Sequence, residues 1–249
     1  MRPVETLVIV IMTCAMPFLA SGAIASQDRL IEKPLDLSIG DLARVTLVYD
    51  PNLSRPHAVT PKEQKELDDI EAQGVSIEYE MDTKINRSGK FFVVSCDSGG
   101  GASFGCNFKQ IGGTSVSSGT HLMGMRFEIP GDGCVYASSE HNDTMFNLRR
   151  KFCLDGDSLK EVEQPFDYVG LESATRHALT VYSDITVKHA IGTIAAGSFV
   201  EVIVANGARG INEMDEYFLV RDNKGLTGWT HLKPTQEDTD IVGMYWLGD

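Results

Sequence analysis

The sequence predicts a mainly β protein: a disulfide-containing, β-rich N-terminal domain with one helix, followed by a second and smaller β domain. Three observations support this prediction. Short alternating apolar runs, separated by turn residues, dominate the chain from Val75 onward. Only residues 60–74 carry helix start and stop signals. The length of 249 residues is enough for one large or two ordinary domains.

Residues 1–25 have the pattern of a secretory signal peptide. Arg2 precedes an apolar run from Leu7 to Leu19, and small residues then form a cleavage site before Ser26. The run is short for a membrane span and contains Pro17. We therefore expect a periplasmic or secreted protein with no membrane span after cleavage; an uncleaved membrane anchor is the alternative.

Four cysteines follow the signal segment, namely Cys96, Cys106, Cys134 and Cys153. An even number of cysteines in an exported chain favours disulfides. Among the possible pairings we favour sequence neighbours, Cys96–Cys106 and Cys134–Cys153. A turn centred on residues 142–143 would place Cys134 opposite Cys153 across a hairpin, provided that the register does not slip by one residue.

The chain is acidic, with a formal net charge of −13 that is spread without a long acidic block. Such a surface repels nucleic acid and anionic lipid, so we expect neither as a partner. A solvated surface is the simplest explanation of the charge, and a cationic partner is the alternative.

The first elements are expected as follows. Residues 26–40 form a loose lead-in, and residues 41–50 form a strand with Val45, Leu47 and Tyr49 on one face. The helix over residues 60–74 begins with a capping box, in which Thr60 and Glu63 satisfy each other's backbone amides, and it ends at Gly74.

The remaining part of the first domain, which we place at residues 41–173, is expected to be strands joined by glycine- and serine-rich loops at 97–105 and 112–120. The last strand segment is interrupted at Pro165. The expected strands cover residues 75–81, 90–96, 121–130, 134–140, 145–154 and 158–173.

Residues 178–232 show five short β runs, and this segment resembles the bacterial SH3-like (SH3b) domains of exported proteins. The runs "LTVYSD", "IGTIAAGSFVEVI" and "YFLVRDNKGLTGWTHL" match the family in order and spacing, with Gly225, Gly228 and Trp229 at the expected places. The resemblance implies a small SH3-like β-barrel at residues 174–233. The segment departs from the family pattern at two places. Its opening loop lacks the usual arginine and Gly-Pro, and residues 205–216 form a long insertion.

The resemblance also implies a binding role, commonly toward cell-wall peptide or glycan. Tyr182, Tyr217 and Trp229 are the aromatic candidates for lining a ligand groove, and Asp184 lies in the opening loop beside it. The competing interpretation of the aromatic residues is core packing, which we favour for Trp229, whereas we favour exposure for Tyr182.

The sequence contains no complete catalytic constellation. Asp97-Ser98-Gly99-Gly100 matches the tetrapeptide around the serine protease nucleophile, but only His57 precedes it and the context of that residue does not match. The cysteines are used by the expected disulfides, and the histidines have no metal-ligand spacing. We therefore expect no enzyme, no metal and no cofactor.

Residues 234–249 form an acidic tether followed by an apolar cluster, which either packs back on a domain or docks elsewhere; we favour packing. The favoured function is an exported binding protein that recognises cell-wall peptide or glycan through the SH3-like domain. The alternative is an envelope protein-binding factor, such as an inhibitor or immunity protein, with loops 97–105 and 112–120 as its binding surface.

Overall fold

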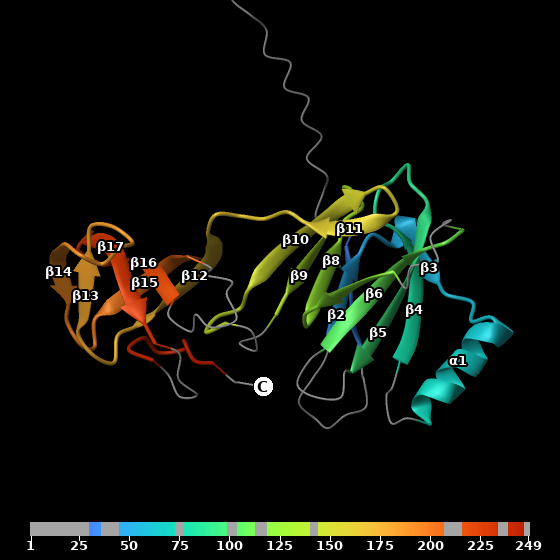
Figure 1. The fold of residues 1–249 in the computed structure, drawn as a ribbon, viewed down its shortest axis with the longest axis horizontal. Helices are drawn as coiled ribbons and strands as arrows, with labels where there is room; N and C mark the ends of the chain where they lie inside the picture. Colours follow the sequence, from blue (N-terminus) through green and yellow to red (C-terminus); the bar gives the residue numbers. More distant parts are fainter. Residues whose placement is uncertain are drawn as a thin grey trace, which may run out of the picture.

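The computed structural model describes residues 30–35, 45–72, 77–98, 104–112, 119–139, 144–206, 216–233 and 239–246. The protein is mainly β, with three sheets and one α-helix among these residues, as the sequence predicts (Figure 1). The expected signal peptide at residues 1–25 lies outside them.

The first sheet has six strands in the order β1-β2-β8-β9-β10-β11. Strand β2 pairs in parallel with β8, while its other neighbour, β1, is antiparallel. The sequence analysis expects a loose lead-in at residues 26–40, and this expectation is wrong for the residues that form β1. Pro34 is tolerated in this strand because β1 lies at the edge of the sheet. The strands are β1 (Ile31–Leu35), β2 (Val45–Tyr49), β8 (Arg126–Ile129), β9 (Cys134–Ser138), β10 (Arg149–Asp155) and β11 (Ser158–Glu161).

The second sheet has five antiparallel strands that follow the chain order β3-β4-β5-β6-β7. The two sheets share one core, in which the rings of Phe108 on β6 and Phe127 on β8 lie 6.1 Å apart. The first part of the chain is therefore a β-sandwich. Its second sheet consists of β3 (Ser54–Pro56), β4 (Ile77–Lys84), β5 (Phe91–Ser98), β6 (Phe104–Gln110) and β7 (Thr120–Met123).

Both expected disulfides are present and lie across neighbouring antiparallel strands. Cys96 of β5 is opposite Cys106 of β6, with sulfur atoms 2.01 Å apart. Cys134 of β9 is opposite Cys153 of β10, with sulfur atoms 2.07 Å apart, in the register that the sequence suggests. Each bond therefore closes a hairpin, one in each sheet of the sandwich.

The segment 121–130 differs from its expectation as a single strand. It divides at Gly124 into β7 of the second sheet and β8 of the first. Gly124 has a φ of 156°, and a Cβ atom there would lie 3.0 Å from the carbonyl oxygen of Ser138. The chain can change sheets at this point because glycine permits both the backbone angle and the close approach.

The helix α1 (Pro61–Glu71) begins with the expected capping box and follows a short 3₁₀ turn, η2 (Pro51–Leu53). The amide of Thr60 donates to the Glu63 carboxylate at 2.8 Å, and the amide of Glu63 donates to the Thr60 hydroxyl at 3.3 Å. Burial acts to raise the pKa of Glu63, but the hydrogen bonds from Thr60 and His57 together outweigh it, so the pKa is lowered.

The third sheet has the order β12-β15-β16-β17-β13-β14 and begins before the boundary that the sequence suggests. Strand β12 pairs with β15 although it was assigned to the first domain. The edge strands β12 and β14 do not pair with each other among the described residues, so the sheet is open and the closed SH3-like barrel that the resemblance implies is not confirmed. Its strands are β12 (Asp167–Ala174), β13 (Leu179–Tyr182), β14 (Ala190–Ile194), β15 (Phe199–Asn206), β16 (Glu216–Asp222) and β17 (Thr227–Leu232).

The core of the third sheet, called the second core below, takes side chains from both ends of the chain. Met145, Phe146 and Leu148, in the segment before β10, are buried in it rather than continuing the β10 hairpin as expected. The tail also packs back, as the sequence suggests, because Ile241 and Met244 are fully buried there. The second core is thus completed by residues that lie before and after the third sheet in the sequence.

Candidate functional site

One row of side chains crosses the outer face of the third sheet, opposite the second core. Tyr182 of β13 pairs with Trp229 of β17, which pairs with Leu219 of β16. Leu219 pairs in turn with Val204 of β15, and Val204 pairs with Tyr168 of β12. Paired residues of neighbouring strands point to the same face, so these five side chains form a continuous line, called the aromatic row below.

The aromatic row is accessible. Tyr182 and Trp229 are half-buried, and Tyr168 is 55% exposed. The ring of Phe166, itself 43% exposed, lies 5.6 Å from that of Trp229. The sequence favours a core role for Trp229, but its side chain lies outside the second core and on the opposite face.

Tyr217 lies on the same face, one row away. It pairs with His231 of β17, and the two rings are 5.0 Å apart. Since Trp229 and His231 are two residues apart on one strand, both rows present rings in the same direction. The structure therefore brings together the three aromatic residues that the sequence singles out.

Asp184 has a local role instead. Its carboxylate accepts hydrogen bonds from the hydroxyl and the amide of Thr186, and from the hydroxyl of Ser183. These bonds, those from Thr186 first, lower the pKa of Asp184 and hold the turn after β13. Its oxygens are thus already engaged by neighbouring residues.

Tyr168 and Phe166 were not singled out by the sequence analysis, and a β-bulge explains their placement. Strand β12 shifts register between Tyr168 and Leu171, and Gly170 within the bulge has a φ of 64°. A Cβ atom on Gly170 would lie 2.4 Å from the Tyr168 hydroxyl oxygen, so the ring rests on the glycine. The available signal was the pattern Pro-Phe-Asp-Tyr at the start of β12, with an aromatic residue on each side of one aspartate.

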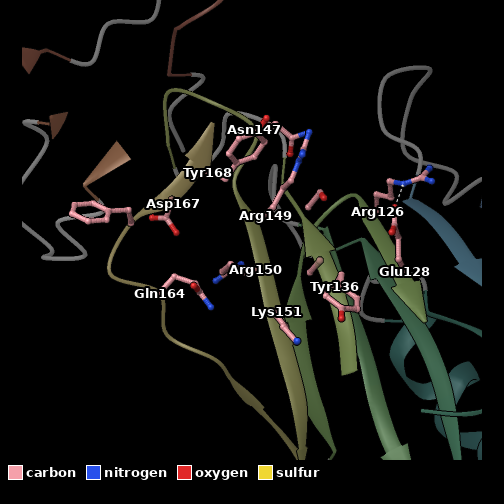
Figure 2. A pocket seen from close by; sticks show the side chains of 13 residues that line it. Arg126, Glu128, Tyr136, Asn147, Arg149, Arg150, Lys151, Gln164, Asp167 and Tyr168 are labelled. Carbon is pink, nitrogen blue, oxygen red and sulfur yellow. Dashed lines mark hydrogen bonds and ion pairs between the residues drawn. The ribbon is translucent and has the colours of Figure 1, made fainter. Parts of the chain in front are cut away.

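A pocket of about 590 Å³ lies beside the exposed end of the aromatic row. Figure 2 shows side chains of β8, β9 and β10 on one side of it, and Gln164, Asp167 and Tyr168 on the other. Arg149 reaches across, with its guanidinium carbon 5.6 Å from the centre of the Tyr168 ring. The pocket therefore lies between the sandwich and the third sheet.

Asp167, which lines this pocket, interacts electrostatically with a second carboxyl group, that of the half-buried Glu216. Asp167 is buried at the start of β12, and Glu216 begins β16. Burial, together with the negative charge of Asp167, raises the pKa of Glu216 to about 7. One oxygen of Glu216, Oε2, is buried without a hydrogen-bond partner among the described residues. The Glu216 carboxyl group therefore remains largely protonated up to a pH of about 7.

The residues of the protease-like tetrapeptide do not assemble a catalytic site among the described side chains. His57 is held by two carboxylates: its Nδ1 is 2.6 Å from Asp82 of β4, and its Nε2 is 3.3 Å from Glu63 of α1. Asp97 pairs instead with His121 at 3.3 Å, and that contact raises the pKa of His121. The side chain of Ser98 lies outside the described residues.

Among the described residues, no group of three or more His, Cys, Asp or Glu side chains could hold a metal ion. None of the described helical segments is long and apolar enough to cross a membrane. Comparison with protein-family models, curated proteins and solved structures found no match to this chain.

Proposed function

We propose that this is an exported, non-enzymatic binding protein, periplasmic or secreted, that recognises cell-wall peptide or glycan on the outer face of the third sheet. The observation that supports the proposal is the aromatic row, in which Tyr182 and Trp229 pair directly across β13 and β17. The disulfide-linked hairpins favour export, because such bonds persist in oxidising compartments.

The row has the chemistry of a site for sugar rings or extended peptide. Ligand sites are lined mainly by aromatic and apolar groups, with a few polar groups that set orientation. Here the rings of Trp229 and Tyr182 provide flat apolar surface, and their polar ends stay near water. His231 and Tyr217 add a second pair of rings in the row next to the aromatic row. The ligand would lie across the strands, along the row.

The first test is co-sedimentation of the protein from Ser26 onward with purified peptidoglycan sacculi. Point variants of the full mature chain are preferable to removal of residues 174–249, because that truncation would separate β12 from its partner β15. Tyr182→Ala is expected to lower the apparent affinity about tenfold, which corresponds to ~1.4 kcal/mol. This size is within the range of single aromatic contacts.

The matched control is Phe199→Ala. Phe199 is also aromatic and 42% exposed, but it lies at the other end of β15, beyond the charged pair of Glu201 and Arg221. If both variants are retained on the sacculi as strongly as the unsubstituted protein, the aromatic row does not contribute to wall binding. No retention of the unsubstituted protein would refute wall binding and favour capture of an envelope protein partner as the next experiment.

A further inference from the structure

The pocket beside the aromatic row is basic, although the protein as a whole is acidic. The chain has a formal net charge of −13, and residues 149–151 are the only place where Lys or Arg residues are adjacent in its sequence. All three line the pocket, together with Arg126. The acidic residues that line it are Glu128 and Asp167. Four cations and two carboxyl groups therefore line this one cavity.

The register of the first sheet explains this concentration of charge. Arg126 of β8 and Arg149 of β10 both pair with Ser138 of β9, while Glu128 and Lys151 both pair with Tyr136. Directly paired residues point to one face, so these two rows are presented together on the outer face of the sandwich. In Figure 2, Gln164 and Asp167 lie beside β10, on the side away from Arg126 and Glu128.

The cations differ in their partners. Arg126 is neutralised by two carboxylates, that of Glu128 at 3.0 Å and that of Glu32 at 3.1 Å. Arg150 donates from Nη2 to the carbonyl oxygen of Met123 at 3.2 Å. Both are therefore engaged within the sandwich.

Arg149 and Lys151 are held by rings instead of carboxylates. Arg149 lies over Tyr168 at 5.6 Å, and the Lys151 ammonium lies over Tyr136 at 5.4 Å. Neither has an ion-pair partner among the described residues. A cation on a ring face keeps its charge and its N–H donors for another acceptor. The Tyr136 hydroxyl donates to Asp132 at 2.7 Å, and burial followed by this contact raises its pKa to about 12.

We propose that this pocket binds an anionic group, a carboxylate or a phosphate, carried by the same wall glycan that lies on the aromatic row. Tyr168 belongs to both the row and the pocket, so one ligand can reach both. A cavity of about 590 Å³ has the size of a small-molecule site. Arg149 and Lys151 neutralise the anion, and Gln164 supplies amide donors. This inference rests on the proposed wall binding.

The test compares three full-length mature proteins on sacculi: the unsubstituted protein, Arg149→Gln/Lys151→Gln, and the control Lys90→Gln/Lys109→Gln. The control removes the same charge from exposed positions around the second sheet of the sandwich. Thermal melting first confirms that all three are folded. We expect the pocket variant to bind about tenfold more weakly, and the control to bind within about twofold of the unsubstituted protein.

Chemically modified sacculi identify the source of the anion. If the ligand is a carboxylate, amidation of the sacculi removes the difference between the pocket variant and the control. If it is a phosphate, stripping of phosphodiester-linked polymers with hydrofluoric acid removes the difference instead. Equal binding of the pocket variant and the control to native sacculi overturns the inference while leaving wall binding in place. Absence of binding by the unsubstituted protein overturns both.

A second measurement does not depend on sacculi. Titration of the unsubstituted protein with N-acetylmuramic acid, N-acetylglucosamine 6-phosphate and neutral N-acetylglucosamine is followed by the arginine Nε–H NMR signals. A shift of the Arg149 signal with either acidic sugar, and none with the neutral sugar, is the expected result. Equal effects of all three sugars would contradict an anion site.

Discussion

Replacement of Phe146 by alanine tests whether the segment before β10 stabilises the third sheet. Phe146 is 3% exposed, and its ring lies edge-on to that of Phe218 on β16, with centroids 6.0 Å apart and planes at 86°. Removal of a buried phenylalanine side chain costs about 3–5 kcal/mol, and an edge-to-face pair accounts for ~1 kcal/mol of that cost. We therefore expect a loss of about 3–5 kcal/mol in the free energy of unfolding.

The assay uses the two tryptophans of the chain, which both report on the third sheet. Trp229 lies in β17, and Trp246 packs against the second core. Urea unfolding followed by tryptophan fluorescence gives the free energy from the midpoint and slope. Phe199→Ala, at a 42% exposed position, is the control and should cost under about 1 kcal/mol. A similarly small loss for Phe146→Ala would refute the shared second core.

Two further predictions concern titratable groups. Because the pKa of Glu216 is raised to about 7 from its ordinary 4.5, the folded protein retains a proton that the unfolded chain has lost. Stability is thus greatest below about pH 4.5 for this group and falls as the pH rises through 7; Glu216→Gln should remove this fall, worth about 1–3 kcal/mol, in urea unfolding at pH 5 and pH 8. His57→Ala breaks the contacts to Asp82 and Glu63 and should loosen α1 by about 1.5–3 kcal/mol, since hydrogen bonds to charged groups contribute that much. Limited proteolysis within α1 should then accelerate at least tenfold, and an unchanged rate would show that His57 does not anchor the helix.

Features that depend on neighbouring residues were predictable. The capping box of α1 needs only Thr60 and Glu63, three positions apart. Each disulfide closes a hairpin between sequence neighbours, so the separations of 10 and 19 residues already favoured the observed pairing. The interruption at Pro165, between β11 and β12, was predicted for the same reason.

The candidate site was predicted only in part. Tyr182, Tyr217 and Trp229 were identified from the resemblance, and the structure places them on one face. Tyr168 and Arg149 were missed because they belong to segments that the sequence analysis assigned to the first domain. Their contact, at 5.6 Å, joins β12 of the third sheet to β10 of the sandwich.

The sequence alone determined the β character, the single helix, the disulfide-linked hairpins and the aromatic residues available for binding. Only the tertiary structure decided which strands are neighbours: the parallel pairing of β2 with β8, the division at Gly124 and the transfer of β12 to the third sheet. The reason is that a strand exposes hydrogen-bonding groups on both edges, and its period of two specifies a buried face without specifying a partner. The partner is selected by burial of distant residues, as Phe146 against Phe218 illustrates.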